Sequence, residues 1–192
     1  MSESLHVLRE PSLRESSLIV GMTGWMNGGE VSTGTVKYLA EKLEADDVAR
    51  IDPEGFYLSS FPGSMEIASL FRPHCRIENG LITALDPAVG TFQAAYSRVL
   101  LLFSGREPNM GWRRYGDCVL DVCARFGTRR IYFVGSVAGL TPHTREPRVG
   151  ASSSTGELRD RLAGLGITPT TYEGPASFVT YLTVRARDAG ID

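Results

Sequence analysis

Two glutamates and a histidine stand where side chains of their kind can do acid–base chemistry. Glu107, His143 and Glu173 each follow a predicted strand, in the loop at its end. A carboxylate or an imidazole can take or give a proton, and Arg145, close to His143, can hold an anion. A second interpretation stays open: a glutamate can cap backbone donors, and a histidine in a proline-bounded loop can be structural. These three are the candidate catalytic residues.

A glycine-rich segment offers a possible anion site. Gly24, Trp25, Asn27 and Gly28 lie between a predicted strand and a predicted helix, where backbone N–H groups can face a negative charge. The spacing matches neither the dinucleotide fingerprint nor the phosphate loop, whose lysine is lacking. The alternative is that the glycines permit a tight turn, while Trp25 packs as a lid or as an interface anchor.

The elements that must position these residues follow from hydrophobic patterning. Continuous apolar runs at 18–20, 99–103 and 131–134 are typical of strands in a sheet that is covered on both faces. Helical periodicity lies between and after them, at 30–43, 112–126, 157–163 and 176–189. The pattern predicts an α/β fold: a three-layer α/β/α sandwich with a mostly parallel central sheet.

In such a sheet, ligands bind at the edge where the strands end. Four loops should therefore meet at one rim of the sheet. The side chains and backbone N–H groups of these loops suit a small anionic ligand. The residues predicted to bind it are Gly24, Trp25, Asn27, Gly28, Trp112 and Arg145.

An irregular region at about 53–95 interrupts the α/β pattern and contains Pro53, Pro62, Pro73 and Pro87. Within it, Asn79-Gly80 separates two strand-like runs at 74–78 and 81–85. Asn-Gly in that position is a strong hairpin signal. We therefore expect one domain over residues 1–192 with an inserted β-hairpin.

The helix exits suggest a further strand. Residues 163–166 end one helix and precede a predicted strand at 167–172, whereas a similar stop at 189–192 has no strand after it. Either the chain is shortened there, or the last helix packs without a following strand.

Composition excludes several classes of protein. The net charge is −2 and there is no dense basic block, so nucleic acid is not an expected partner. The longest apolar run, 99–103, is too short for a membrane span, and residues 1–10 do not resemble a secretory leader. Three cysteines favour a reducing cytoplasm, and their spacing from the histidines suits no metal. No cofactor, metal or activated nucleophile is predicted.

Five short blocks together resemble the PAC2 family, the proteasome assembly chaperone 2-like proteins of bacteria and archaea. In order, they are residues 18–29, 49–57, 105–108 followed by Trp112, 137–145 and 172–175. The first block departs from the family's usual sequence, because Asn27 replaces an aspartate and Gly28 replaces an alanine. If that aspartate were a catalytic acid, its loss would weaken an enzymatic interpretation.

The resemblance implies a phosphorylase/hydrolase-like α/β/α fold and homo-oligomers. For eukaryotic and archaeal members it also implies handling of proteasome subunits. Two functions stay open for this chain. One is a non-catalytic assembly chaperone or protein-interaction module; the other is a small-molecule enzyme (hydrolase, transferase or ligase-like) that uses the loop rim.

Overall fold

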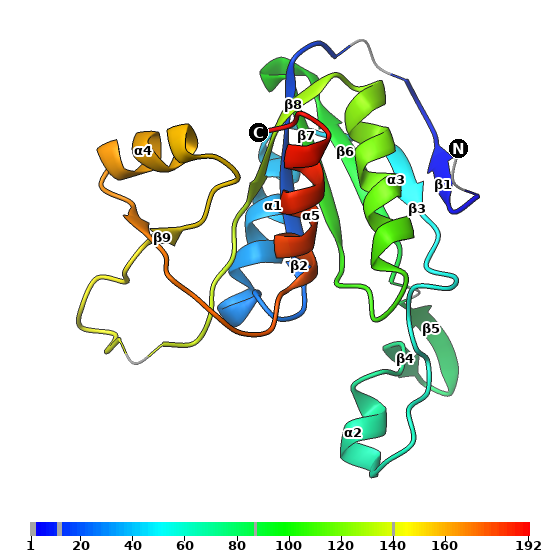
Figure 1. Cartoon of the computed structure of the whole chain (residues 1–192). Coiled ribbons are helices and arrows are strands. Elements are labelled where there is room, and N and C mark those ends of the chain that lie inside the picture. The colour runs from blue at the N-terminus through cyan, green and yellow to red at the C-terminus, as the bar shows by residue number, and fades with distance from the viewer. Residues whose placement is uncertain (1–2, 11–12, 87, 140) are drawn as a thin grey trace.

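The computed structural model describes residues 3–10, 13–86, 88–139 and 141–192. Pro87 and Leu140, which belong to segments considered above, lie outside the described residues. Helices cover both faces of one central sheet, and a smaller extension projects from its lower end (Figure 1).

Six strands form the central sheet, in the spatial order β1-β3-β6-β7-β2-β8. Their bounds are β1 (Leu5–Val7), β2 (Ser16–Thr23), β3 (Asp46–Ile51), β6 (Gly90–Ala95), β7 (Leu100–Arg106) and β8 (Thr128–Phe133). The apolar runs of the sequence correspond to β2, β7 and β8, and these three strands are parallel.

The expectation of a mostly parallel sheet is wrong in detail, because the other three pairings, β1–β3, β3–β6 and β6–β7, are antiparallel. The polar residues Asp46, Asp47 and Gln93 break the hydrophobic pattern of β3 and β6, which hid these strands in the sequence. In β6, buried residues alternate with half-buried ones, as in a strand with one less protected face. The insertion is therefore shorter than 53–95, since β6 belongs to the central sheet.

The helices form the outer layers of the sandwich. Figure 1 shows α1 (Val31–Lys42) behind the sheet, and α3 (Trp112–Arg125) and α5 (Phe178–Asp188) in front of it. Two short 3-10 turns, η1 (Gly28–Glu30) and η2 (Tyr96–Arg98), precede α1 and β7. Among the described residues, no helix is both long enough and apolar enough to cross a membrane.

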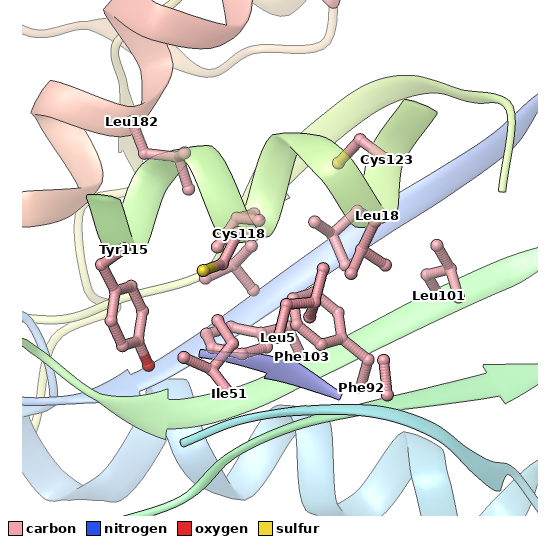
Figure 2. Packing of buried hydrophobic residues seen from close by; sticks show 14 of the residues in the cluster. Leu5, Leu18, Ile51, Phe92, Leu101, Phe103, Tyr115, Cys118, Cys123 and Leu182 are labelled. Carbon is pink, nitrogen blue, oxygen red and sulfur yellow. The ribbon is translucent and has the colours of Figure 1, made fainter. Parts of the chain in front are cut away.

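The core lies between the sheet and the α3–α5 layer (Figure 2). Phe92 and Phe103 pack ring against ring across β6 and β7, with centroids 4.4 Å apart. Tyr115, Cys118 and Cys123 of α3 close over them. Each is fully buried, so α3 presents a continuous apolar face to the sheet.

Two segments stand apart from the central sheet. One contains α2 (Met65–Ser69) and the predicted hairpin, in which β4 (Cys75–Glu78) pairs with β5 (Leu81–Leu85). The other contains α4 (Gly156–Gly164) and a small parallel pair, β9 (Gly150–Ala151) with β10 (Thr168–Pro169). The strand expected at 167–172 is thus reduced to β10 and does not extend the central sheet.

The outer edge of β8 receives the end of the described chain. The N–H of Asp192 donates to the carbonyl of Arg129 at 3.0 Å, and its carbonyl accepts from the N–H of Ile131 at 2.8 Å. These bonds have the spacing of a parallel ladder. The last helix is therefore followed by a backbone contact with the sheet edge.

Candidate functional site

Glu107 joins two segments at the end of β7. The N–H of Trp25 donates to Glu107 Oε2 at 3.1 Å, and the N–H of Phe178, the first residue of α5, donates to Oε1 at 2.5 Å. Its own N–H donates to the carbonyl of Thr23 at 2.9 Å. Both carboxylate oxygens therefore accept backbone hydrogen bonds, one of them at a helix start, where negative charge is favoured.

The glycine-rich loop after β2 is tied to the loop after β8. Gly28 N–H donates to the carbonyl of Ser136 at 3.0 Å, and Ser136 N–H donates to the carbonyl of Met26. The Ser136 hydroxyl also donates to the Gly28 carbonyl. A β-carbon on Gly28 would lie 3.1 Å from Ser136 Oγ, so glycine permits this close approach.

Asn27 holds the start of α1. Its Oδ1 accepts from the N–H of Thr33 at 3.1 Å, and its Nδ2 donates to the Thr33 hydroxyl at 3.2 Å. An acceptor at this place satisfies a helix N–H that lacks a partner within the helix. An aspartate could accept the backbone bond but could not donate the second one.

The loop before α3 is pinned to the loop after β3. Both Asn109 and Met110 donate their N–H groups to the carbonyl of Phe56, while Asn109 Oδ1 accepts from the N–H of Leu58. The indole N–H of Trp112 donates to the carbonyl of Pro108 at 2.8 Å. Trp112 is thus a packing residue of the helix start, and its ring meets those of Phe178 and Tyr181.

An open hollow of about 530 Å³ lies beside these loops. Its lining residues are Thr23, Gly24, Asp86, Arg106, Glu107, Pro108, Asn109 and Trp112. Arg106 donates to the carbonyl of Leu70 at 2.7 Å, and Asp86 accepts from the N–H of Ala88 at 2.8 Å. With Glu107, Asn109 and Trp112, these make five lining side chains that hydrogen-bond to the protein's own main chain.

Two tyrosines, Tyr57 and Tyr115, lie near this hollow. The sequence did not predict that they would form a pair. The Tyr57 hydroxyl donates to the carbonyl of Arg106 at 2.6 Å and lies 3.3 Å from the Tyr115 hydroxyl. Burial raises the pKa of Tyr57 to about 12, and burial also raises the pKa of Tyr115 well above its ordinary value. Both hydroxyls therefore stay protonated at neutral pH.

Two glycines in strands, Gly90 and Gly105, make room for the Tyr115 ring. They are the feature of the sequence that could have indicated a large side chain packed against these strands. A β-carbon on Gly90 would lie 2.8 Å from the Tyr115 hydroxyl oxygen, and one on Gly105 would lie 3.1 Å from it. Both glycines occupy strands, where this residue usually marks a bulge or a close approach.

The remaining candidates lie on exposed segments. His143 and Arg145 belong to the loop between β8 and β9, and Glu173 belongs to the segment that leads into α5; Figure 1 shows this loop running out below β9. Within the described ranges, no hydrogen bond joins any of the three to Glu107. The structure thus connects Trp25, Gly28 and Glu107 through their loops, but does not link His143, Arg145 or Glu173 to them.

No cluster of three or more histidine, cysteine, aspartate or glutamate residues suited to a metal ion occurs in the described part of the chain. Glu107 is the candidate acid or base that lines the hollow. Because the carboxylate already accepts two N–H bonds, it suits a structural role better than proton transfer.

Comparisons with known proteins agree with this architecture. The model of the PAC2 family matches residues 21–192. A Mycobacterium tuberculosis proteasome-assembly chaperone homologue superposes with a TM-score of 0.77 at 24% identity, over 91% of this chain and 71% of that one. A PAC2 family protein of Streptomyces avermitilis gives 0.73 at 22% identity, over 92% and 72%.

An archaeal homologue of proteasome-assembly chaperone, PbaA of Pyrococcus furiosus, gives a TM-score of 0.62 at 16% identity, over 97% of this chain and 72% of that one. At identities this low, the superpositions establish a shared fold. No protein of curated function matches the sequence significantly.

Proposed function

Since the chain belongs to the PAC2 family, we propose that it is a non-catalytic assembly chaperone, a protein-interaction module that acts as a homo-oligomer. Two of its structural neighbours are described as homologues of a proteasome-assembly chaperone. By the same reasoning, its partners are subunits of a multi-subunit protease of the proteasome type, and its compartment is the cytoplasm.

One observation carries this proposal: five side chains that line the rim hollow are hydrogen-bonded to the protein's own backbone. A catalytic carboxylate needs an oxygen within reach of a substrate proton, whereas Glu107 directs both oxygens to main-chain N–H groups. The arrangement supports a role in fixing the loops that present a surface.

Trp25 is the candidate anchor of that surface. Its side chain is 62% exposed, although its N–H is held by Glu107. Tryptophans on pre-organised loops often dominate protein–protein binding, because little conformational freedom is lost when the partner arrives. We therefore place Trp25 in the contact with the client subunit.

The test is an assembly assay with purified protease subunits from the same host. The protein should bind free subunits and accelerate their assembly, and Trp25→Ala should weaken binding by roughly tenfold or more. Tyr38→Ala is the matched control, since Tyr38 is an aromatic residue on α1 with similar exposure, 60%. Absence of subunit binding, or equal losses in both variants, would contradict the proposal.

The hollow supports a second function, binding of a small anionic molecule for a hydrolase, transferase or ligase-like reaction. Its volume falls within the usual range for ligand sites, about 300–1,000 Å³, and Arg106 retains donors beyond its bond to Leu70. Of the predicted site residues, Gly24, Trp112 and Glu107 line the hollow. Under this proposal, Trp25, Asn27, Gly28 and Arg145 would have to reach the ligand from neighbouring loops, with Glu107, His143 or Glu173 as acid or base.

A further inference from the structure

The inserted segment 59–86, called the arm below, holds α2, β4 and β5 away from the body of the molecule (Figure 1). None of its described residues is buried. The parts of the arm are nevertheless joined to one another. The rings of Phe61 and Phe71 stack with centroids 4.9 Å apart, and the N–H of Asp86 donates to the carbonyl of His74 at 2.9 Å. The arm is therefore a unit that can move relative to the core.

One side chain of the central sheet holds the arm. Arg106, the last residue of β7, donates from Nη2 to the carbonyl of Leu70 at 2.7 Å. Leu70 directly follows α2, and carbonyl groups at the end of a helix lack partners within it, so an arginine is well suited to bind there. Within the described ranges, this is the one hydrogen bond between residues 59–85 and the rest of the chain. It is called the latch below.

The latch lies at the rim hollow. Arg106 lines that hollow, and so do Asp86, at the end of the arm, and Asn109. The side chain of Asn109 accepts from the N–H of Leu58, immediately before the arm, at 3.1 Å. Both ends of the arm and its latch therefore adjoin the same hollow, so a molecule bound there would lie beside the residues that hold the arm.

The half-buried guanidinium of Arg106 forms no salt bridge with a carboxylate in the described part of the chain. The two carboxylates that line the hollow bind main-chain groups instead: Glu107 accepts from two N–H groups, and Asp86 accepts from a third. A guanidinium can bind a carboxylate or phosphate through two parallel hydrogen bonds, and it attracts a full negative charge more strongly than a carbonyl dipole. An anion in the hollow would therefore compete with Leu70 for Arg106.

We infer that the latch is a ligand-controlled switch: a small anion in the rim hollow, with the oxygens of a carboxylate or phosphate, binds Arg106 and releases the arm. A carbonyl oxygen carries partial negative charge, so an anion on the same guanidinium also repels the Leu70 carbonyl. The two states are the latched and the released arm, and the ligand favours the state in which Arg106 is free to bind it. The inference rests on the second function proposed above, the binding of a small anionic molecule, and adds its consequence for the arm.

Amide hydrogen exchange of the whole chain, measured by mass spectrometry on peptides of the arm, tests the switch. Millimolar inorganic phosphate is the probe, and sodium chloride at the same ionic strength is the control. Phosphate should speed exchange in the arm roughly threefold or more, because release raises the population of open conformations. Peptides of α4, a helix that is likewise without buried residues, should exchange at the same rate in both salts.

Two variants separate the latch from other effects of phosphate. Arg106→Met removes the donor and keeps a long apolar stem. Exchange in its arm should be roughly fivefold faster without phosphate, as expected for the loss of one hydrogen bond, and phosphate should add nothing. Arg113→Met is the matched control, because Arg113 is an exposed arginine of α3, and its arm should behave as in the parent. Calorimetric titration with phosphate measures binding of the anion independently.

Four results would overturn the inference, and they distinguish it from the function on which it rests. If the parent binds no phosphate, the anion site and the switch both fail. If phosphate binds but exchange in the arm is unchanged, the ligand site stands and the switch is wrong. Slower exchange with phosphate would show that the ligand closes the arm. If Arg106→Met leaves exchange in the arm as in the parent, the latch does not hold it. The phosphate measurements on the parent need no variant, so they decide the matter even if Arg106→Met does not fold.

Discussion

The carboxylate of Glu107 occupies the space that a side chain on Gly24 would need. A β-carbon at Gly24 would lie 2.6 Å from Glu107 Oε2 and 2.8 Å from Glu107 Cβ. The φ angle of Gly24 is 137°, which residues with a side chain rarely adopt. The loop that presents Trp25 is therefore shaped jointly by a residue after β2 and a residue at the end of β7.

Replacement of Gly24 should break this fit. Gly24→Ala combines an unfavourable φ with contact against the Glu107 side chain, and should lower the free energy of unfolding by about 2 kcal/mol or more. Gly34→Ala is the control: Gly34 lies inside α1 with open space around it, so alanine should raise stability by about 0.5–1 kcal/mol. Urea unfolding measures both changes, and equal effects would refute the argument.

Glu107→Gln tests the structural role of the carboxylate. A glutamine has one acceptor oxygen, so either the N–H of Trp25 or that of Phe178 loses its partner. The expected loss is about 1–3 kcal/mol of unfolding free energy, measured by urea denaturation. Glu173→Gln, at an exposed position, should change stability by less than about 0.5 kcal/mol. A stable Glu107→Gln protein would contradict the assignment.

The partly buried Tyr57 predicts loss of stability in alkali. The pKa of Tyr57 is about 12 in the folded protein and about 10 when unfolded. A raised pKa stabilises the fold fully below pH 10, and this contribution is lost as the pH rises toward 12, by up to about 3 kcal/mol. Tyr57→Phe should show a smaller fall in urea midpoint between pH 9 and pH 11, whereas Tyr96→Phe should behave as the parent. An unchanged fall in Tyr57→Phe would contradict this.

The cysteines should differ sharply in reactivity. Cys75 is exposed, whereas Cys118 and Cys123 are buried in the core, and burial raises the pKa of Cys123 to about 12. Since the thiolate is the reactive form, a thiol reagent at pH 8 should label one cysteine per chain rapidly and the others only on unfolding. Cys75→Ser should abolish the rapid phase. Two rapid thiols in the parent protein would contradict the packing of α3.

Much of the α/β framework can be predicted from the sequence. The apolar runs of β2, β7 and β8 and the periodicity of the helices predict those elements within a few residues, and Asn79-Gly80 predicts the hairpin. Both turn residues have positive φ, 51° and 81°, as the favoured hairpin turn requires. These signals are local, so a single sequence carries them.

Strand pairing and hydrogen bonds between residues far apart in the chain cannot be predicted in this way. Strand β1 has three residues and β3 begins with two aspartates, and both are stabilised by neighbours distant in the chain. The sequence predicts Glu107 as a candidate acid or base from its residue type and its place after a strand. Its structural role could not be predicted, because its partners, the N–H groups of Trp25 and Phe178, lie 82 and 71 residues away in the chain. Residue type and position placed it at the rim, but only the fold reveals what it binds.

Native mass spectrometry of the protein, purified gently from its own host, tests the central claim most directly. An assembly protein should appear as a homo-oligomer, alone or with a bound protein subunit, and without a stoichiometric small molecule. Glu107→Gln should leave that composition unchanged wherever the variant remains folded. A monomer that carries a small molecule in one-to-one ratio, lost in Glu107→Gln, would contradict the claim and assign the rim to ligand chemistry.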